Sequence, residues 1–277
     1  MPKTWFITGA SRGLGAEIAR AALLNGDDVA AAGRRTNAVS ETLGPDGDAL
    51  LAIELDVTDP AQAVTAAAAA RSRFGGVDVL VNNAGYGQLG FFEENTLEEA
   101  RAQLETNLLG TMNVTWAVLP MMRAARKGRI FNISSTAGIR AAETGSIYGA
   151  SKFGMEGFSE SLAREIAPLG LSVTIVEPGL FRTNFLDAAS VRFATKQVSD
   201  YAVRSAELRK LYEGIAGHQK GDPRKLAEAI VRLAGEDKPP LRFAAGSDAV
   251  AAVEEKIASL RADLDCWRGL SIGTDGD

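Results

Sequence analysis

The 277-residue chain contains one cysteine, Cys266, and one histidine, His218. A single cysteine cannot form an intramolecular disulfide, which agrees with the reducing cytoplasm, where we expect the protein to be located. One histidine excludes a histidine-rich metal site, and we predict no bound metal. It also excludes a Ser-His-Asp hydrolase unless His218 is the base, and we interpret His218 as an ordinary loop residue.

Long apolar runs and clusters of positive charge are also missing. No apolar segment is long enough to cross a bilayer, and residues 1–4 do not resemble a signal peptide. The formal net charge is −5 and no basic stripe stands out, which argues against a nucleic-acid partner. With 46% hydrophobic and 23% charged residues, the composition is that of a globular protein. We therefore expect neither a membrane nor a nucleic acid as partner.

Short β-prone runs alternate with helical patterns, which predicts a doubly wound, Rossmann-type α/β sheet with helices on both faces. The expected strands are 3–8, 29–33, 50–56, 77–81, 128–135, 171–176 and 241–244. This mostly parallel, seven-stranded sheet forms one domain, 1–277, and such sheets bind ligands at the carboxyl ends of their strands. A long helix is expected from 97 to about 126, and another from the region of Tyr148 to about 167. Two segments break the pattern: 181–221, interpreted as a substrate lid, and a tail at 267–277.

A glycine-rich turn follows the first strand, with the sequence Thr8-Gly9-Ala10-Ser11-Arg12-Gly13-Leu14-Gly15. Its glycines allow a tight turn and a close approach to a diphosphate, which the N-terminus of the next helix attracts. Gly-x-x-x-Gly-x-Gly spacing is weak evidence alone, because a protein without cofactor can use the same tight turn. The strand before it and the helix after it favour cofactor binding.

The second strand ends in Gly33-Arg34-Arg35, where dinucleotide-binding proteins often place an acidic residue on the adenosine ribose. An arginine pairs with a 2′-phosphate and an aspartate repels it, so Arg34 and Arg12 predict NADP rather than NAD. The alternative is that Arg34 and Arg35 are solvated loop charges.

Tyr148 and Lys152 are four residues apart in a helical segment and therefore share one face. A nearby ammonium favours the phenolate, so the pair is a candidate proton donor. An amphipathic helix without chemistry would carry the same spacing.

Taken together, these motifs resemble the short-chain dehydrogenase/reductase family, closely over 4–183 and loosely beyond. The glycine turn corresponds to the family's cofactor motif, and Asp56-Val57 to the pair beside adenine. The Asn82-Asn83-Ala84-Gly85 turn corresponds to the segment beside the cofactor, and Pro178, Gly179 and Thr183 to the run at the nicotinamide. The resemblance assigns the catalytic tetrad to Asn107, Ser135, Tyr148 and Lys152. The neighbouring Ser134 is the less suitable candidate, because Ser135 is thirteen positions before Tyr148, which is the family's usual spacing.

The resemblance implies an NADP(H)-dependent oxidoreductase that interconverts a ketone and a secondary alcohol, similar to the branch of 17β-hydroxysteroid dehydrogenases and carbonyl reductases. Tyr148 would deliver the proton, Ser135 would hold the carbonyl oxygen, and Asn107 would hold a water. Lys152 would lower the pKa of Tyr148 and bind the nicotinamide ribose. The alternatives are a catalytically silent NADP-binding regulator and a sugar-nucleotide epimerase or dehydratase.

Three aromatic residues, Phe181, Phe185 and Phe193, are candidates for a substrate pocket, although a lid that covers the core would have the same composition. The partner is then a small carbonyl or alcohol compound. Relatives often pair through two long helices, so a homodimer or homotetramer is expected.

Overall fold

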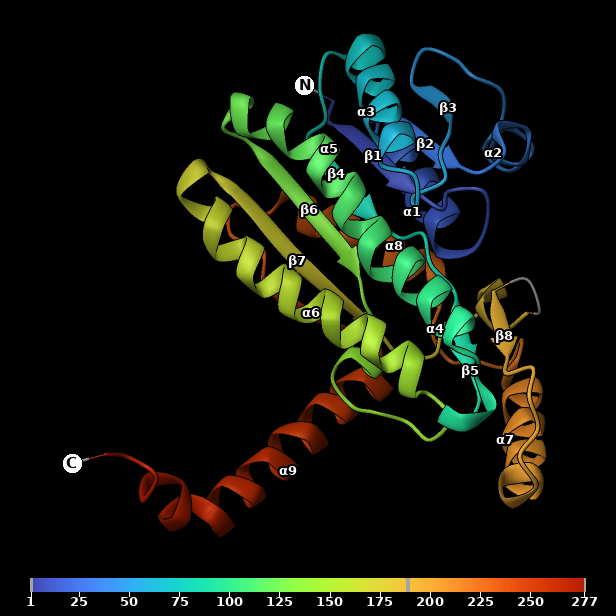
Figure 1. The fold of residues 1–277 in the computed structure, drawn as a ribbon. Coiled ribbons are helices and arrows are strands. Elements are labelled where there is room, and N and C mark those ends of the chain that lie inside the picture. The colour runs from blue at the N-terminus through green and yellow to red at the C-terminus, as the bar shows by residue number, and fades with distance from the viewer. Residues whose placement is uncertain (1, 188–189, 277) are drawn as a thin grey trace.

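The central element is a seven-stranded parallel sheet in the order β3-β2-β1-β4-β6-β7-β9 (Figure 1). The computed structural model describes residues 2–187 and 190–276. The strands are β1 (Thr4–Thr8), β2 (Asp28–Gly33), β3 (Leu50–Glu54), β4 (Val79–Asn82), β6 (Gly128–Ile133), β7 (Leu171–Pro178) and β9 (Arg242–Ala245). This confirms the predicted doubly wound, single-domain α/β fold.

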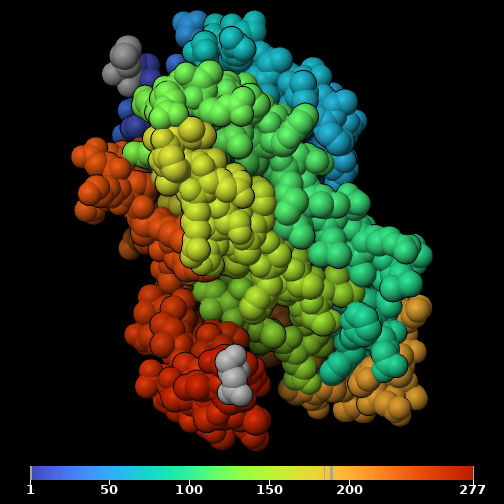
Figure 2. Space-filling model, turned by 60° about the vertical axis from the view of Figure 1, so that its left-hand side comes forward, coloured from blue at the N-terminus to red at the C-terminus, as the bar shows by residue number. Residues whose placement is uncertain are grey.

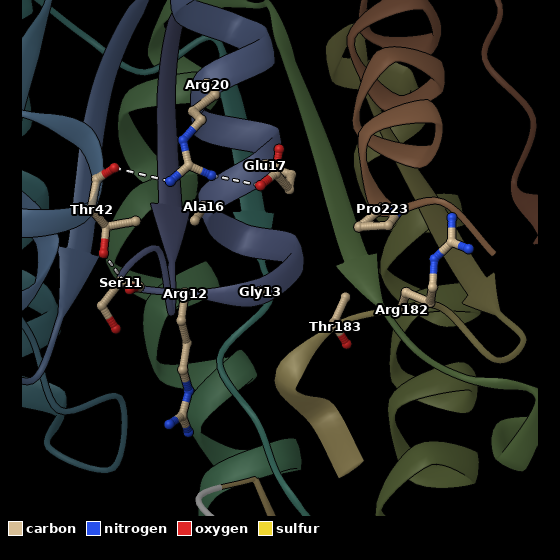
Figure 3. A pocket seen from close by; sticks show the side chains of 10 residues that line it. All are labelled: Ser11, Arg12, Gly13, Ala16, Glu17, Arg20, Thr42, Arg182, Thr183 and Pro223. Atoms are coloured by element: carbon tan, nitrogen blue, oxygen red, sulfur yellow. Dashed lines mark hydrogen bonds and ion pairs between the residues drawn. The ribbon is translucent and has the colours of Figure 1, made fainter. Parts of the chain in front are cut away.

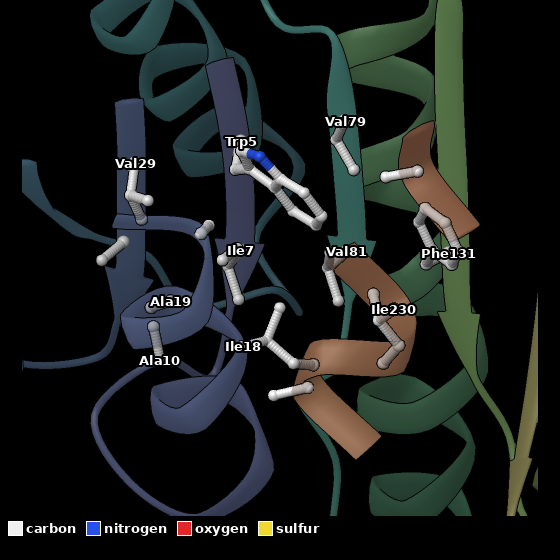
Figure 4. Packing of buried hydrophobic residues seen from close by; sticks show 14 of the residues in the cluster. Trp5, Ile7, Ala10, Ile18, Ala19, Val29, Val79, Val81, Phe131 and Ile230 are labelled. Carbon is white, nitrogen blue, oxygen red and sulfur yellow. The ribbon is translucent and has the colours of Figure 1, made fainter. Parts of the chain in front are cut away.

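Helices cover both faces of the sheet because its strands alternate their side chains between two apolar clusters. Trp5 and Ile7 of β1 face one cluster, and Phe6 between them faces the other. The first cluster packs against α1 (Gly13–Leu24) and α8 (Pro223–Gly235), and Figure 4 shows Ile18 and Ile230 meeting there. The second packs against α3 (Pro60–Phe74), α5 (Gly110–Ala125) and α6 (Ser146–Ile166). The sheet is therefore buried on both sides.

Two elements differ from the sequence-based expectation in the helical layers. The structure has a helix, α2 (Thr36–Leu43), that the sequence reading did not predict between the second and third strands. The long helix expected from 97 to about 126 consists of α4 (Leu97–Leu104), a π-helical turn η2 (Glu105–Leu109) and α5. Thr96 begins α4 with the expected capping box, in which it accepts a hydrogen bond from the Glu99 amide at 3.1 Å.

The carboxyl edge of the sheet carries a second, two-stranded parallel sheet that was not predicted, β5 (Gly87–Leu89) with β8 (Val191–Phe193). Its strand β8 and the helix α7 (Ala202–Ile215) belong to the segment interpreted as a lid. The remaining short turns are η1 (Phe92–Glu94), η3 (Thr136–Gly138), η4 (Ala167–Leu169), η5 (Asn184–Leu186) and η6 (Ser199–Tyr201).

The last helix, α9 (Ser247–Ile272), continues past Trp267, where the sequence suggested an irregular tail. Figure 1 shows α9 in red, projecting away from the sheet, and in Figure 2 its atoms form the lower edge of the molecule. Among helices in the described residues, none combines the length and the apolar character needed to cross a membrane.

Candidate active site

The glycine turn between β1 and α1 has a backbone that larger residues would not tolerate. Gly9 and Gly13 adopt positive φ angles of 67° and 56°, in the left-handed region that favours glycine. A Cβ atom at Gly15 would lie 2.5 Å from both the Gly9 carbonyl oxygen and Asn83 Nδ2. The first turn of α1 carries no acidic residue. The turn therefore presents the N-terminal amides of α1 to an anion in a cradle that side chains do not fill.

A hollow of about 290 Å³ opens beside this turn (Figure 3). Ser11, Arg12 and Gly13 line one side, and Arg182 and Thr183 lie across from them at the start of the lid. A Cβ at Gly13 would be 3.8 Å from Thr183 Cβ, so the turn and the lid approach each other closely. The hollow is thus at the position where a dinucleotide's diphosphate is expected.

The end of β2 lies next to the glycine turn, as the prediction of a phosphate corner requires. The Ala10 amide donates to the Ala32 carbonyl at 3.0 Å, and Thr8 pairs with Ala32 in the sheet. Arg34 and Arg35 follow directly and are exposed. The guanidinium groups of Arg12 and Arg34 thus belong to neighbouring corners of one sheet edge, and their contact with a 2′-phosphate stays a prediction.

Hydrogen bonds join the turn at 82–85 to the glycine turn. Thr8 Oγ1 accepts from the amides of Asn83 and Ala84 at 2.9 and 3.0 Å, and Asn83 Nδ2 donates to the Thr8 carbonyl at 3.0 Å. Beneath the turn, Asn82 Nδ2 donates to Asn132 Oδ1 at 2.8 Å. Two loops that are 75 residues apart in sequence are therefore held in a single geometry.

Asn107 is fully buried in the π-helical turn η2, and its side chain is engaged by the backbone beside it. Its Oδ1 accepts from the Tyr86 amide at 3.1 Å, and its Nδ2 donates to the Tyr86 carbonyl at 3.0 Å and to Ser151 Oγ at 3.2 Å. A Cβ at Gly85 would lie 3.0 Å from Asn107 Oδ1. The amide therefore joins the 82–85 turn to α6. Short π-helical turns often accompany functional sites.

Tyr148 and Lys152 lie on α6, one turn apart, with Lys152 Nζ 5.8 Å from the centroid of the Tyr148 ring. Lys152 is buried, and its ammonium donates to the Ile133 carbonyl at the end of β6 at 2.7 Å. Ser135 begins η3 just beyond β6, and its Oγ accepts from the Ala137 amide at 3.1 Å. These three polar side chains meet at the carboxyl edge of β6.

Burial shifts both titrating groups of this pair toward their neutral forms. It raises the pKa of Tyr148 to about 12, and a hydrogen bond to Ser135 opposes that rise. Burial also lowers the pKa of Lys152 to about 8, and the carboxylate of Glu156 opposes that fall. The expected lowering of the tyrosine pKa by the lysine is not what the structure shows, because desolvation dominates. Tyr148 is instead a phenol that stays protonated at neutral pH.

One further turn along the same face of α6, Glu156 is buried, and sequence reasoning did not single it out. Its carboxylate pairs with Arg242 of β9, which also donates to Glu177 of β7 at 2.9 Å and to Glu160 at 3.2 Å. Burial raises the pKa of both Glu156 and Glu177, and Arg242 opposes the rise in each. The spacing of four residues from Lys152 was the signal that could have identified Glu156.

The remaining predicted cofactor residues lie along the same sheet edge. Asp56 Oδ1 accepts from the Thr58 amide and hydroxyl at 2.9 and 2.7 Å, so this carboxylate closes a turn after β3. Val57 is buried against Gly110 of α5. Pro178 ends β7, and the Gly179 amide donates to the Ala245 carbonyl at 3.0 Å.

The three candidate pocket phenylalanines do not meet. The Phe185 ring centroid lies 6.0 Å from that of Tyr148, so Phe185 borders the catalytic candidates. Phe181 packs against the first core cluster instead, and Phe193 lies 6.5 Å from Tyr212 of α7. Only Phe185 of the three is thus next to Tyr148, and the pocket assignment stays a prediction.

The parallel α/β fold and the residues at the carboxyl edge of its sheet define a class of protein. They are typical of a dinucleotide-binding enzyme with a Tyr-Lys pair at the strand ends. The family described as short chain dehydrogenase matches residues 3–192, and the chain belongs to this family. Proteins of this class bind NAD or NADP, and solved structures of the same fold hold one or the other.

Two curated relatives and one solved structure illustrate the membership. "Oxidoreductase BOA17" of Botryotinia fuckeliana is 37% identical, over 99% of this chain and 100% of that protein. The "3-ketodihydrosphingosine reductase" of Bacteroides thetaiotaomicron is 38% identical, over 88% of each. The crystal structure of a short-chain dehydrogenase from Streptomyces avermitilis is 42% identical, covers 100% of both chains and has a TM-score of 0.92. The protein is therefore an oxidoreductase of this family.

Proposed function

We propose that the protein is an NADP(H)-dependent reductase that converts a ketone to a secondary alcohol, with Tyr148 as the proton donor. The observation that carries this proposal is the buried Lys152 beside Tyr148, at a distance of 5.8 Å from the ring centroid, with Ser135 at the same strand end. The bound nicotinamide supplies the hydride.

The residues of the chain have separate tasks in this proposal. The amides at the start of α1 and the glycine cradle bind the diphosphate, while Arg12 and Arg34 bind the 2′-phosphate. The hydroxyls of Ser135 and Tyr148 hold the carbonyl oxygen, on which negative charge develops. Tyr148 then gives its proton to that oxygen. Burial raises the pKa of Tyr148 to about 12, so the phenol keeps its proton at neutral pH until negative charge develops on the carbonyl oxygen.

Asn107 and Lys152 complete the proposed tetrad. The side-chain amide of Asn107 is hydrogen-bonded to the backbone of Tyr86 and to the hydroxyl of Ser151. Its proposed contribution is therefore to shape the π-helical turn, where a water can return protons through Lys152. Lys152 is proposed to bind the nicotinamide ribose.

We also propose a class of substrate and a surface through which two copies of the chain pair. The name of the Bacteroides relative, a 3-ketodihydrosphingosine reductase, supports a carbonyl substrate with an apolar chain, and Phe185 next to Tyr148 provides an apolar contact for one. We also propose pairing through α5 and α6, on which Trp116 and Phe153 are 73% and 42% exposed. A cytoplasmic location stays a prediction from the single cysteine.

Replacing Tyr148 by Phe tests the proposal. The variant keeps the ring but loses the proton, so we expect kcat with NADPH and a panel of prochiral ketones to fall ~10²- to 10⁴-fold. NADPH affinity, measured by fluorescence titration, is expected to stay unchanged. Tyr201→Phe is the matched control, because the Tyr201 hydroxyl binds Glu93 at the surface.

Near-normal turnover by Tyr148→Phe would refute the assignment. A wild-type protein that binds NADPH but turns over no ketone would favour the silent regulator instead. An NAD that stays bound after extensive dilution would favour an epimerase or dehydratase.

A further inference from the structure

The C-terminal helix α9 is anchored to the body only near its base, among the contacts that the structure describes. Ala249 and Ala252 are buried there, and Glu255 pairs with Arg140. From Ile257 onward every residue of the helix is exposed, and the helix extends away from the sheet (Figures 1 and 2). The exposed part, residues 257–272, thus projects into solvent with large apolar side chains on it.

These apolar side chains form one stripe along the helix. Its members recur at alternating spacings of three and four residues, which is the heptad pattern of a coiled-coil seam. The stripe consists of Val250, Val253, Ile257, Leu260, Leu264 and Trp267. Ile257, Leu260, Leu264 and Trp267 are 62%, 54%, 49% and 60% exposed. A soluble helix rarely leaves four consecutive seam positions in water, so this stripe is suited to a partner helix.

We propose that α9 pairs in antiparallel orientation with α9 of a second copy of this chain. The seam determines the register. Ile257 lies opposite the partner's Leu260, Val253 opposite the partner's Leu264, and Val250 opposite the partner's Trp267. Val250 is 45% exposed although it is near the base, so the body leaves room for the partner's bulky indole.

The charged residues that flank the seam agree with this register and orientation. In an antiparallel pair centred between Ala258 and Ser259, Glu254 lies beside the partner's Arg261, and Lys256 beside the partner's Asp263. Two-fold symmetry repeats both attractive pairs. A parallel pair would place Lys256 beside the partner's Arg261, a repulsive contact, and Asp263 beside the partner's Arg268, an attractive one. The antiparallel form has only attractive pairs among these flanking charges and is therefore favoured.

The same charges argue against a lipid surface as the occupant. Between 254 and 268 the helix carries four acidic and three basic residues. A helix that lies on an anionic membrane has a polar face rich in Lys and Arg, which this one is not. The proposed contact also differs from the pairing through α5 and α6, so that a protein using both would be a tetramer.

The first experiment measures the assembly of the full-length protein by light scattering coupled to gel filtration. Ile257→Glu and Leu260→Glu each place a carboxylate in the seam, and each is expected to halve the mass of the wild-type particle. Leu24→Glu is the matched control, because Leu24 is 89% exposed on the body, and it is expected to leave the mass unchanged. Ketone reduction by each variant reports that the body is folded. A wild-type mass equal to that of both seam variants would overturn the proposal.

The second experiment tests the register by exchanging charges. Glu254→Lys alone and Arg261→Glu alone each create two repulsive contacts in the antiparallel pair, and each is expected to raise the dimer dissociation constant at least ~10-fold, which corresponds to about 1.4 kcal/mol. The double variant restores attraction and is expected to recover wild-type association. Additive weakening in the double variant would exclude this register.

The third experiment uses the only cysteine in the chain, Cys266, which is exposed on α9. A nitroxide attached there is expected to show a distance of roughly 22 Å along the helix axis to its partner, at about 1.5 Å per residue. Parallel helices would bring the two labels to about 10 Å. The short distance, the absence of any spin–spin distance, or binding of monomers to phosphatidylserine vesicles would each refute the antiparallel pair.

Discussion

The buried ammonium of Lys152 should make the stability of the protein depend on pH in an unusual direction. Burial lowers the pKa of this amine from 10.5 to about 8. A difference of this size corresponds to a cost of ~3 kcal/mol for holding the charged amine in the folded protein. The hydrogen bond to the Ile133 carbonyl and the carboxylate of Glu156 offset only part of the desolvation.

The sign follows from the lower pKa in the folded state. Below pH 8 the amine is protonated in both states, and the folded state carries the full cost. Between pH 8 and 10.5 the folded state releases this proton while the unfolded state keeps it, so the free energy of unfolding rises with pH. The variant Lys152→Met is similar in volume and has no such proton. We therefore expect the stability of the wild type relative to Lys152→Met to increase by ~3 kcal/mol from pH 7 to 10.5.

Urea unfolding of the cofactor-free wild type and Lys152→Met, at intervals across this pH range, measures the difference directly. Titrating groups that do not interact with Lys152 are common to both proteins and cancel in the comparison, provided that the two urea dependences are equal. Lys238→Met, at the surface, controls for the removal of an amine in general. A difference between wild type and Lys152→Met that is flat or falls with pH would show that the desolvation reasoning is incorrect.

Two further predictions concern the cofactor edge. Gly15→Ala places a Cβ 2.5 Å from Asn83 Nδ2 and from backbone, so we expect ~1–3 kcal/mol of destabilisation and a loss of NADPH binding by fluorescence titration. Gly157→Ala, in α6 with open space around it, should show neither effect. Equal stability and equal NADPH binding in the two variants would contradict the claim that the glycine turn has no room for a side chain at Gly15. Arg34→Asp should lower kcat/KM with NADPH, because a carboxylate repels the 2′-phosphate. The ratio of kcat/KM with NADH to kcat/KM with NADPH should therefore rise. An unchanged ratio in Arg34→Asp would mean that Arg34 does not contact that phosphate, and Arg35→Asp provides the comparison.

The catalytic candidates could be recognised from the sequence because their arrangement is local or motif-based. A spacing of four residues places Tyr148 and Lys152 on one helical face in any helix. The glycine turn similarly needs only a strand before it and a helix after it. The fold class was predictable for a related reason, since short apolar runs separated by helical patterns are typical of strands in a parallel sheet that is buried on both faces.

Other features depend on contacts between distant segments. No local pattern brings the Ile133 carbonyl to Lys152, or Arg242 of β9 to Glu156 and Glu177 on α6 and β7. The unpredicted sheet of β5 and β8 has only three residues in each strand, and its two strands are about 100 residues apart in the chain. Such short strands give too little periodicity to be recognised.

The chain's own order of residues thus determined the parallel α/β sheet, the glycine turn and the one-turn separation of the phenol from the amine. Tertiary structure alone decided how those groups titrate and which phenylalanine stands beside them. A pKa responds to the solvent and charges that surround a group, and those come from strands and helices far away in sequence. Helical spacing suggested that Lys152 lowers the tyrosine pKa, whereas removal from water raises it and keeps Tyr148 protonated.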